Sequence, residues 1–372
     1  MNKHFLSALL LLLLSLGAAH AADKPISQPI AREQVMDEIV REAGLDTRNP
    51  QSTAIDRVSS LLRARDMKGI WLASPGHLAI DQDFRVTILG FDFFDAAVRG
   101  RQYLNESGVV VATRIDSRET FAALINDPKP QANPSGPVDD SPLPSMSLLR
   151  SFTIPLRNRL SKLPWRTGSY VVDVMLGQQV SNRARFQITA GVPAERDPAV
   201  AAFIEQQKST GSTPKELRPM PEPGDAVPTY RKTANSLAPP SDVGIVLAAE
   251  RVSVYRPGSR SVLRGSYRLP VPAAFYRSGS GDGLSSTAAV PVTLVIVGNI
   301  MPGPFVAPLS VASYERIERN ASESVVTGQF EIDLFALPET SKVPQTYSIW
   351  AYSGEVRSAP VLAAVVTPEM LK

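Results

Sequence analysis

The chain has 372 residues, with 39 Lys or Arg against 36 Asp or Glu, and its formal net charge at pH 7 is only +3. So small a net charge for this length excludes a globally basic nucleic-acid-binding composition. The complete absence of cysteine excludes a disulfide scaffold, a cysteine-ligated zinc site and a lipidated N-terminal cysteine. We expect two or three domains from the length, and no cofactor.

Residues 1–21 predict a secretory signal peptide. Lys3 precedes an apolar run from Phe5 to Ala19, and Ala19-His20-Ala21 is typical of a signal-peptidase site. The run is short for a membrane anchor, and no later segment reaches the roughly 18 apolar residues that cross a bilayer. We therefore expect an exported protein that is neither a lipoprotein nor membrane-spanning. A large exported chain without disulfides fits the bacterial periplasm, and secretion is the alternative.

Residues 22–68 predict a helical N-terminal region. Two apolar stripes recur at helical spacing, the first over residues 30–44 and the second after Asn49-Pro50. They consist of Val35, Met36, Ile39, Val40 and Ala43, then Ala54, Ile55, Val58, Leu61 and Leu62. Acids and bases are balanced on both helices, which disfavours membrane-surface helices. We expect the pair to pack against the first β domain or to form a small cap.

The remainder of the chain alternates in the manner of β-strands and divides into two domains. We assign residues 69–190 to β domain 1, residues 191–241 to a Pro-rich linker and residues 242–372 to β domain 2. Within domain 1, residues 127–146 contain six prolines and predict a long exposed loop.

An internal repeat relates the ends of the two domains. Residues 151–188 and 329–366 each begin with Phe-x-Ile-x-Leu, continue through a turn with a Leu-Pro or Val-Pro pair, and then give a strand opened by a tyrosine. The tyrosine strands are Tyr170-x-Val172-x-Val174 and Tyr347-x-Ile349-x-Ala351, followed at equal distance by Gly177 and Gly354.

This order of strand, loop, tyrosine-led strand, turn and strand resembles the E–F–G end of an immunoglobulin or fibronectin type III sandwich. The resemblance implies a mainly β fold with two immunoglobulin-like antiparallel β-sandwich domains. It also implies that Tyr170 and Tyr347 are corner tyrosines, whose hydroxyls bond back to the backbone. The cysteine pair of antibody domains is absent, so the resemblance concerns the architecture alone.

Histidine limits the catalytic options. After the predicted signal peptide the sequence contains one histidine, His77, in a Ser-Pro-Gly-His turn. A Ser-His-Asp triad would require this residue, and a two-histidine metal site would require another. Asp81 and Asp83 follow closely and complete an alternative site for a hydrolase of envelope glycan or peptide, whereas turn-capping acids are the simpler interpretation. We expect no metal site.

Arginine is segregated into strips. The candidate binding residues are Arg157, Arg159, Arg183, Arg185, Arg260, Arg264 and Arg268, while acids concentrate between Glu315 and Glu339. Strand parity predicts that Arg183, Arg185, Arg260, Arg264 and Arg268 face outward. Such strips favour an anionic glycan, lipid or protein surface. Solvated sheet faces or charge-protected edges are the alternatives. Aromatic residues do not interleave with these arginines, so we expect no nucleic-acid partner.

The leading functional prediction is a non-catalytic binding or assembly module of the cell envelope. A hydrolase with a site near His77, Asp81 and Asp83 is the alternative. A periplasmic chaperone built from two sandwiches is a third possibility, which the length of the predicted linker disfavours.

Overall fold

The structure is a computed structural model, and it describes residues 29–47, 49–79, 86–95, 108–126, 147–190, 237–272, 290–299, 304–311, 316–319, 323–337 and 344–371. Within these ranges the chain is mainly β with few helices, as the sequence predicts. The predicted signal peptide, the six-proline segment and most of the predicted linker lie outside them. No helix in the described ranges is long and apolar enough to cross a membrane.

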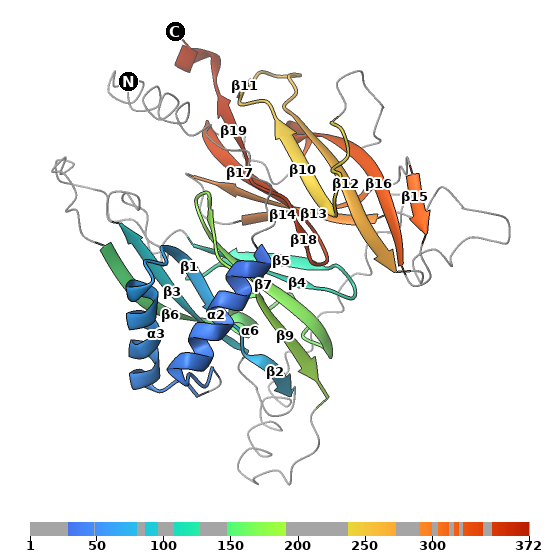
Figure 1. Ribbon diagram of the computed structural model, residues 1–372. Helices are drawn as coiled ribbons and strands as arrows, with labels where there is room; N and C mark the ends of the chain where they lie inside the picture. Colours follow the sequence, from blue (N-terminus) through green and yellow to red (C-terminus); the bar gives the residue numbers. More distant parts are fainter. Residues whose placement is uncertain are drawn as a thin grey trace, which may run out of the picture.

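Two helices, α2 (Pro29–Ala43) and α3 (Ser52–Ala64), cover one face of the first sheet (Figure 1). Gly44 ends α2 with a φ of 65°, a left-handed conformation that favours glycine at a helix C-terminus. Met36 and Val58 of the helices pack with Trp71 and Phe91 of the sheet in one buried cluster. The helical stripes are therefore the faces through which the two helices contact the first sheet.

The first half, residues 69–190, contains two sheets joined by the short helix α6 (Leu156–Arg159). Sheet I has the order β1 (Gly69–Ala73), β3 (Thr87–Asp95), β6 (Ser147–Pro155). Sheet II has the order β2 (Gly76–Ala79), β9 (Ala184–Thr189), β7 (Gly168–Leu176), β4 (Val109–Arg114), β5 (Thr120–Leu124), with β8 (Gln179–Val180) beside β7.

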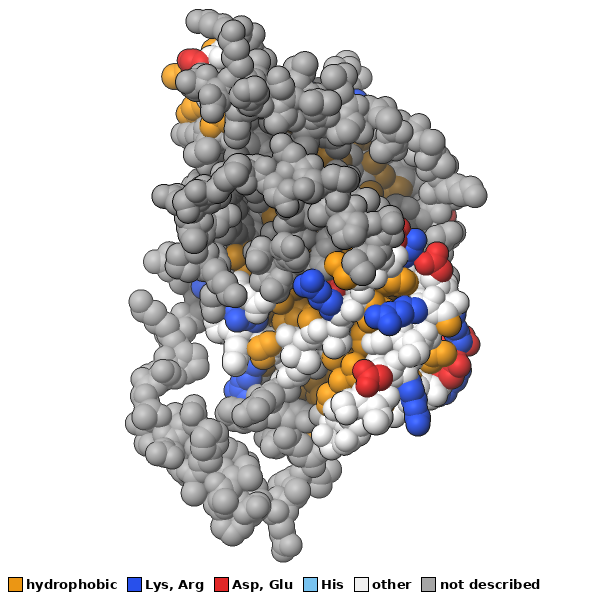
Figure 2. Space-filling view, turned by 90° about the vertical axis from the view of Figure 1, so that its left-hand side faces the viewer, with side chains coloured by type: hydrophobic (Ala, Val, Ile, Leu, Met, Phe, Trp, Pro, Cys, Tyr) orange, Lys and Arg blue, Asp and Glu red, His pale blue; other side chains and the backbone are white. Residues whose placement is uncertain are grey.

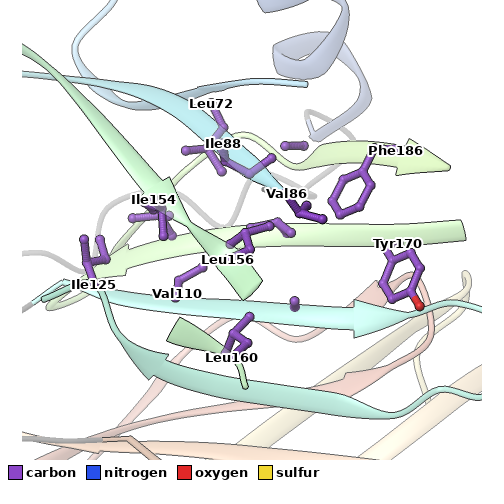
Figure 3. Packing of buried hydrophobic residues seen from close by; sticks show 14 of the residues in the cluster. Leu72, Val86, Ile88, Val110, Ile125, Ile154, Leu156, Leu160, Tyr170 and Phe186 are labelled. Carbon is purple, nitrogen blue, oxygen red and sulfur yellow. The ribbon is translucent and has the colours of Figure 1, made fainter. Parts of the chain in front are cut away.

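Sheets I and II share a hydrophobic core (Figure 3). Ile88 and Ile154 enter it from sheet I, while Val110, Tyr170 and Phe186 enter it from sheet II. The alternating residues of β7 that the sequence assigns to one face, from Tyr170 to Leu176, all belong to this core. The period-two pattern was thus sufficient to identify the inner face of the strand.

The second half, residues 237–371, also contains two sheets around one core, in which Leu263, Tyr267, Leu294, Phe330 and Ile349 meet. Sheet III has the order β11 (Val252–Val254), β19 (Val361–Val366), β17 (Gln345–Ser353), β13 (Val290–Gly298), β14 (Pro304–Val311), with β18 (Val356–Arg357) beside β17. Sheet IV has the order β10 (Gly244–Ala249), β12 (Val262–Pro272), β16 (Glu323–Asp333), β15 (Arg316–Arg319). The 3-10 turns are η3 (Leu334–Ala336) and η4 (Pro368–Leu371).

The two halves repeat one connectivity. In sheet II the first strand, β2, runs parallel to the last, β9, and in sheet III β11 runs parallel to β19 in the same way. Gly177 and Gly354 both turn the chain with a φ of 58°. Ser181 and Ser358 follow and accept a hydrogen bond from the preceding strand at 2.9 and 2.8 Å. The repeat read from the sequence is therefore a repeat of local geometry.

The halves meet through the outer faces of sheets II and III, in a contact that we call the junction. A separate buried cluster fills it, with Val111 and Met175 from sheet II and Val295, Trp350 and Tyr352 from sheet III. At its edge β5 contacts β14. The helices and the four sheets thus form consecutive layers, each pair of neighbours sharing buried apolar side chains.

Several strands were not identified from the sequence, namely β2, β5, β14 and β15. Strand β14 contains Pro304 and Pro308, and proline reads as a loop signal because it cannot donate to a ladder. The strand stands at the end of its sheet, where a missing donor is tolerated.

A glycine faces an aromatic ring across two strands in each half, and this contact gives a test of the fold. Gly265 on β12 lies opposite Phe330 on β16, as Gly90 lies opposite Phe152 in the first half. A Cβ at Gly265 would overlap the Phe330 ring. We expect Gly265→Ala to lower the free energy of unfolding by about 1–3 kcal/mol, the usual range for overpacking.

The matched control is Gly244→Ala, since a Cβ there would meet its nearest atom at 3.8 Å. We expect that substitution to change stability by less than about 0.5 kcal/mol. Chemical denaturation of both variants would measure the difference, and equal effects would contradict the packing described.

Candidate functional site

The connection between β6 and β7, residues 156–167, is the most uniformly basic segment of the first half, and we call it the basic connection. It carries Arg157, Arg159, Lys162 and Arg166, and no acid occurs from residue 156 to residue 172. Arg157, Lys162 and Arg166 are exposed, and Arg159 is half-buried. Its cations therefore face solvent on a short stretch of chain.

Apolar anchors hold the basic connection to the core. Leu156, Leu160 and Leu163 are buried between the sheets, so the cationic side chains alternate with residues that cannot leave the core. Trp165 lies 5.4 Å from Tyr170 between ring centroids, and Tyr170 stacks on Phe186 at 5.5 Å. Such aromatic contacts add about 0.5–1.5 kcal/mol each beyond burial. The connection is thereby fixed in position.

Tyr170 closes the base of the basic connection. Its hydroxyl donates to the carbonyl of Arg166 at 2.8 Å and accepts from the N–H of the same residue at 2.9 Å. Burial raises the pKa of the hydroxyl, although the hydrogen bond that it accepts from the Arg166 N–H acts in the opposite direction. The hydroxyl of Tyr170 therefore bonds back to the backbone four residues upstream. The hydroxyl of Tyr347 accepts a hydrogen bond from the Gln345 side-chain amide at 2.9 Å.

Arg183 lies in the junction, and its predicted outward direction brings it against the second half. Its Nη2 is 3.2 Å from Oδ2 of Asp173 on β7, and only 9% of its side chain is exposed. Arg357 on β18 of the second half approaches the same carboxylate, with Nη1 2.7 Å from Oδ1. One buried carboxylate therefore binds an arginine from each half.

The charges of this ion cluster are set by the two arginines. Burial would raise the pKa of the Asp173 carboxyl, but the positive charges of Arg183 and Arg357 outweigh burial and lower that pKa. Tyr352 lies beside the cluster, and its burial, together with the Asp173 charge, raises the pKa of its hydroxyl well above the ordinary value. The carboxylate is therefore ionised and the phenol neutral at ordinary pH.

Arg185 joins three parts of the structure at the rim of the junction. Its guanidinium is 3.3 Å from Glu33 of α2 and 3.0 Å from Glu355 of the second half. Burial raises the pKa of Glu33, and the charges of Arg185 and Arg183 oppose that rise. Arg32, also on α2, donates to the Val180 carbonyl at 3.2 Å. The N-terminal helix is thus tied to the rim of the junction.

Arg260, Arg264 and Arg268 lie at or on β12, the strand that pairs with β16. Arg264 is 3.2 Å from Glu331, its register partner on β16, and Arg260 lies within 3.7 Å of Glu331 and 3.5 Å of Asp333. Arg268 stands opposite Thr327. The outward direction predicted for this strip places two of its arginines among acids, because the acid-rich segment is the neighbouring strand.

His77 is exposed on β2, opposite Gln187 of β9. Asp81 and Asp83 lie outside the described residues, so the alternative hydrolase site stays a prediction. Nowhere in the described ranges do three His, Asp or Glu side chains come together in a group that could hold a metal ion.

Sequence reasoning did not single out Arg357 or Asp173 as partners. The sequence did indicate that Asp173 is unusual, because it is the single acid in the apolar run from Tyr170 to Leu176. In such a run Val171 and Met175 make the second face apolar as well, which is typical of a strand buried on both sides. That second face is the one in the junction.

No protein-family model and no curated protein sequence matches the chain. Among solved structures, similarity is found to a biofilm associated protein (BSP domain), with 7% identity over 82% of this chain, 32% of that chain and a TM-score of 0.16. Similarity is also found to a two-domain fibronectin type III segment of chicken tenascin, with 9% identity over 80% of this chain, 97% of that chain and a TM-score of 0.15. Similarity is found as well to a complex of Dpr2 Ig1-Ig2 with DIP-Theta Ig1-Ig3, with 11% identity over 80% of this chain, 99% of that chain and a TM-score of 0.15. The chain spans about a third of the first of these structures. TM-scores this low inform neither its fold nor its function.

The ion cluster predicts a large cost for removing its carboxylate. Asp173→Asn leaves two buried guanidinium groups with a neutral partner, and we expect a loss of about 3–5 kcal/mol of unfolding free energy at pH 7. The matched control is Lys68→Gln, which breaks an exposed ion pair of 2.8 Å with Asp95 and should cost less than about 1 kcal/mol. Equal losses in denaturant titrations would show that the cluster is not buried as described.

The lowered pKa of Asp173 also predicts a dependence on pH. A carboxyl whose folded-state pKa is depressed stabilises the protein above its unfolded pKa of about 3.9, and that contribution is lost as pH falls toward the folded value. The stability difference between the parent and Asp173→Asn should therefore shrink below about pH 4. A difference that stays constant from neutral to acid pH would contradict this assignment.

Proposed function

We propose that the chain is an exported, non-catalytic binding or assembly module of the cell envelope, located in the periplasm. In this proposal each pair of sheets is an immunoglobulin-like sandwich, and the basic connection contacts an anionic envelope component. The predicted signal peptide supports export, and the absence of cysteine supports the periplasm.

The immunoglobulin-like assignment is supported by the order of the strands. In each half the first strand is shared between two sheets, with β1 and β2 in the first half and β10 and β11 in the second. The last strand of each half, β9 or β19, lies between that switched strand and the tyrosine-led strand. The hydrogen bonds of Tyr170 add the corner that the resemblance implies.

The observation that carries the functional proposal is the exposure of like charges on the basic connection. Arg157, Lys162 and Arg166 are exposed on a segment that buried leucines and Trp165 hold in place. Fixed cations bind a polyanion at less entropic cost than cations on a free tail. On the face drawn in Figure 2, the described cations and acids are interspersed and do not form a single-sign patch.

The other candidate arginines fit this role less well. Arg183 is buried against Asp173, and Arg185, Arg260 and Arg264 have acids within 3.7 Å. An anion that bound them would have to displace an internal carboxylate. We therefore assign anion contact to the basic connection ahead of the β12 strip.

The test is co-sedimentation of the purified chain from residue 22 onward with isolated envelopes across a salt series. We expect binding that weakens with salt, because contacts between exposed charges are screened. Lys162→Glu with Arg166→Glu should reduce the bound fraction at low salt by about tenfold or more, from the loss and reversal of two surface contacts at about 1 kcal/mol each.

The matched control is Arg57→Glu with Arg63→Glu on α3, two exposed arginines whose reversal changes the net charge equally. We expect this control to bind nearly as the parent does. Equal losses in both variants would show a non-specific charge effect, and salt-resistant binding would indicate a protein partner recognised by other contacts. Either outcome would overturn the assignment to the basic connection.

A further inference from the structure

The apolar part of the junction does not by itself dictate one orientation of the two halves. The apolar cluster consists of Val109, Val111 and Met175 on one side and of Val295, Val297, Trp350 and Tyr352 on the other. Hydrophobic contact is non-directional, and sheets pack face to face in more than one relative orientation. Something else must select the orientation that the structure shows.

Two sets of polar contacts cross the junction. In one, Asp173 of the first half meets Arg357 at 2.7 Å, while Arg183 donates to the Glu355 carbonyl. In the other, Arg118 of the first half donates to Ser353 Oγ at 2.9 Å and to the Pro270 carbonyl. These contacts are directional, so each constrains how one face lies on the other.

Energetics supports a role in selecting an orientation rather than in adding stability. Taking three charges out of water costs several kcal/mol per ion, and well-packed apolar replacements of buried ion clusters are often neutral or stabilising. Asp173 is 1% exposed, so nearly the full free-energy cost of desolvation applies to its carboxylate. Buried polar groups in some proteins instead exclude alternative packings.

We propose that Asp173, Arg183 and Arg357 form a polar key, which makes one orientation of the two halves more stable than all other dockings of the same apolar faces. In this proposal the apolar side chains around the polar key supply most of the stability of the contact. This inference concerns the junction and is independent of anion binding by the basic connection.

The absence of cysteine makes the inference directly testable with spin labels. Arg57→Cys on α3 and Ser241→Cys before β10 place one nitroxide on an exposed site of each half. In the parent, pulsed dipolar spectroscopy should give one narrow distribution of distances. In the triple variant Asp173→Leu, Arg183→Met, Arg357→Met, we expect a distribution that is broad or has several maxima, with a melting temperature equal to or above that of the parent.

A narrow, unshifted distribution in the folded triple variant would overturn the proposal, whatever its melting temperature. Should that variant not fold, the pair Asp173→Asn with Arg357→Met decides by the same criterion, since Asn still accepts from Arg183. The control is the labelled Lys68→Gln variant, which breaks the ion pair with Asp95, and neither residue of that pair belongs to the junction cluster. It should keep the distance distribution of the parent.

Discussion

The packing of the outer face of sheet II on the outer face of sheet III is the contact on which the rest of the structure depends. Strands β7 and β17 each contribute one face to the core of their own half and the other face to the junction. Met175 and Trp350 are 1% and 0% exposed there. Separating the halves would expose this apolar surface to water, at a free-energy cost of about 25 cal/mol for each Å² exposed. The two halves are therefore parts of one body.

The junction combines two kinds of interaction with different consequences. Its apolar side chains stabilise the contact, but they do not favour one orientation of the halves. Asp173 and its two arginines make directional contacts, and their burial costs desolvation free energy. Tyr352 and Trp350 lie in the same layer, so the cluster is shielded from solvent and from salt. Arg32 and Glu33 of α2 attach the N-terminal helices to the same region.

The fold separates arginines that lie close together in the sequence. Arginines that are segregated along the sequence are distributed in space among three environments: the buried junction, the acid-paired face of sheet IV and the basic connection. In the third of these, several cations face solvent together on a segment without acids.

Periodicity in the sequence determined which residues are buried within each half. The alternation from Tyr170 to Leu176 identified a strand, and the helical stripes identified α2 and α3. The backbone hydrogen bond of Tyr170 also followed from the repeat. Local pattern suffices for these features because burial of one face imposes a fixed period. The tertiary structure alone decided what covers the second faces. Whether Arg183 meets water, an acid or another domain depends on a partner 174 residues away, Arg357, which shares its carboxylate. A period reports that a face is apolar or charged, but not which distant segment lies against it.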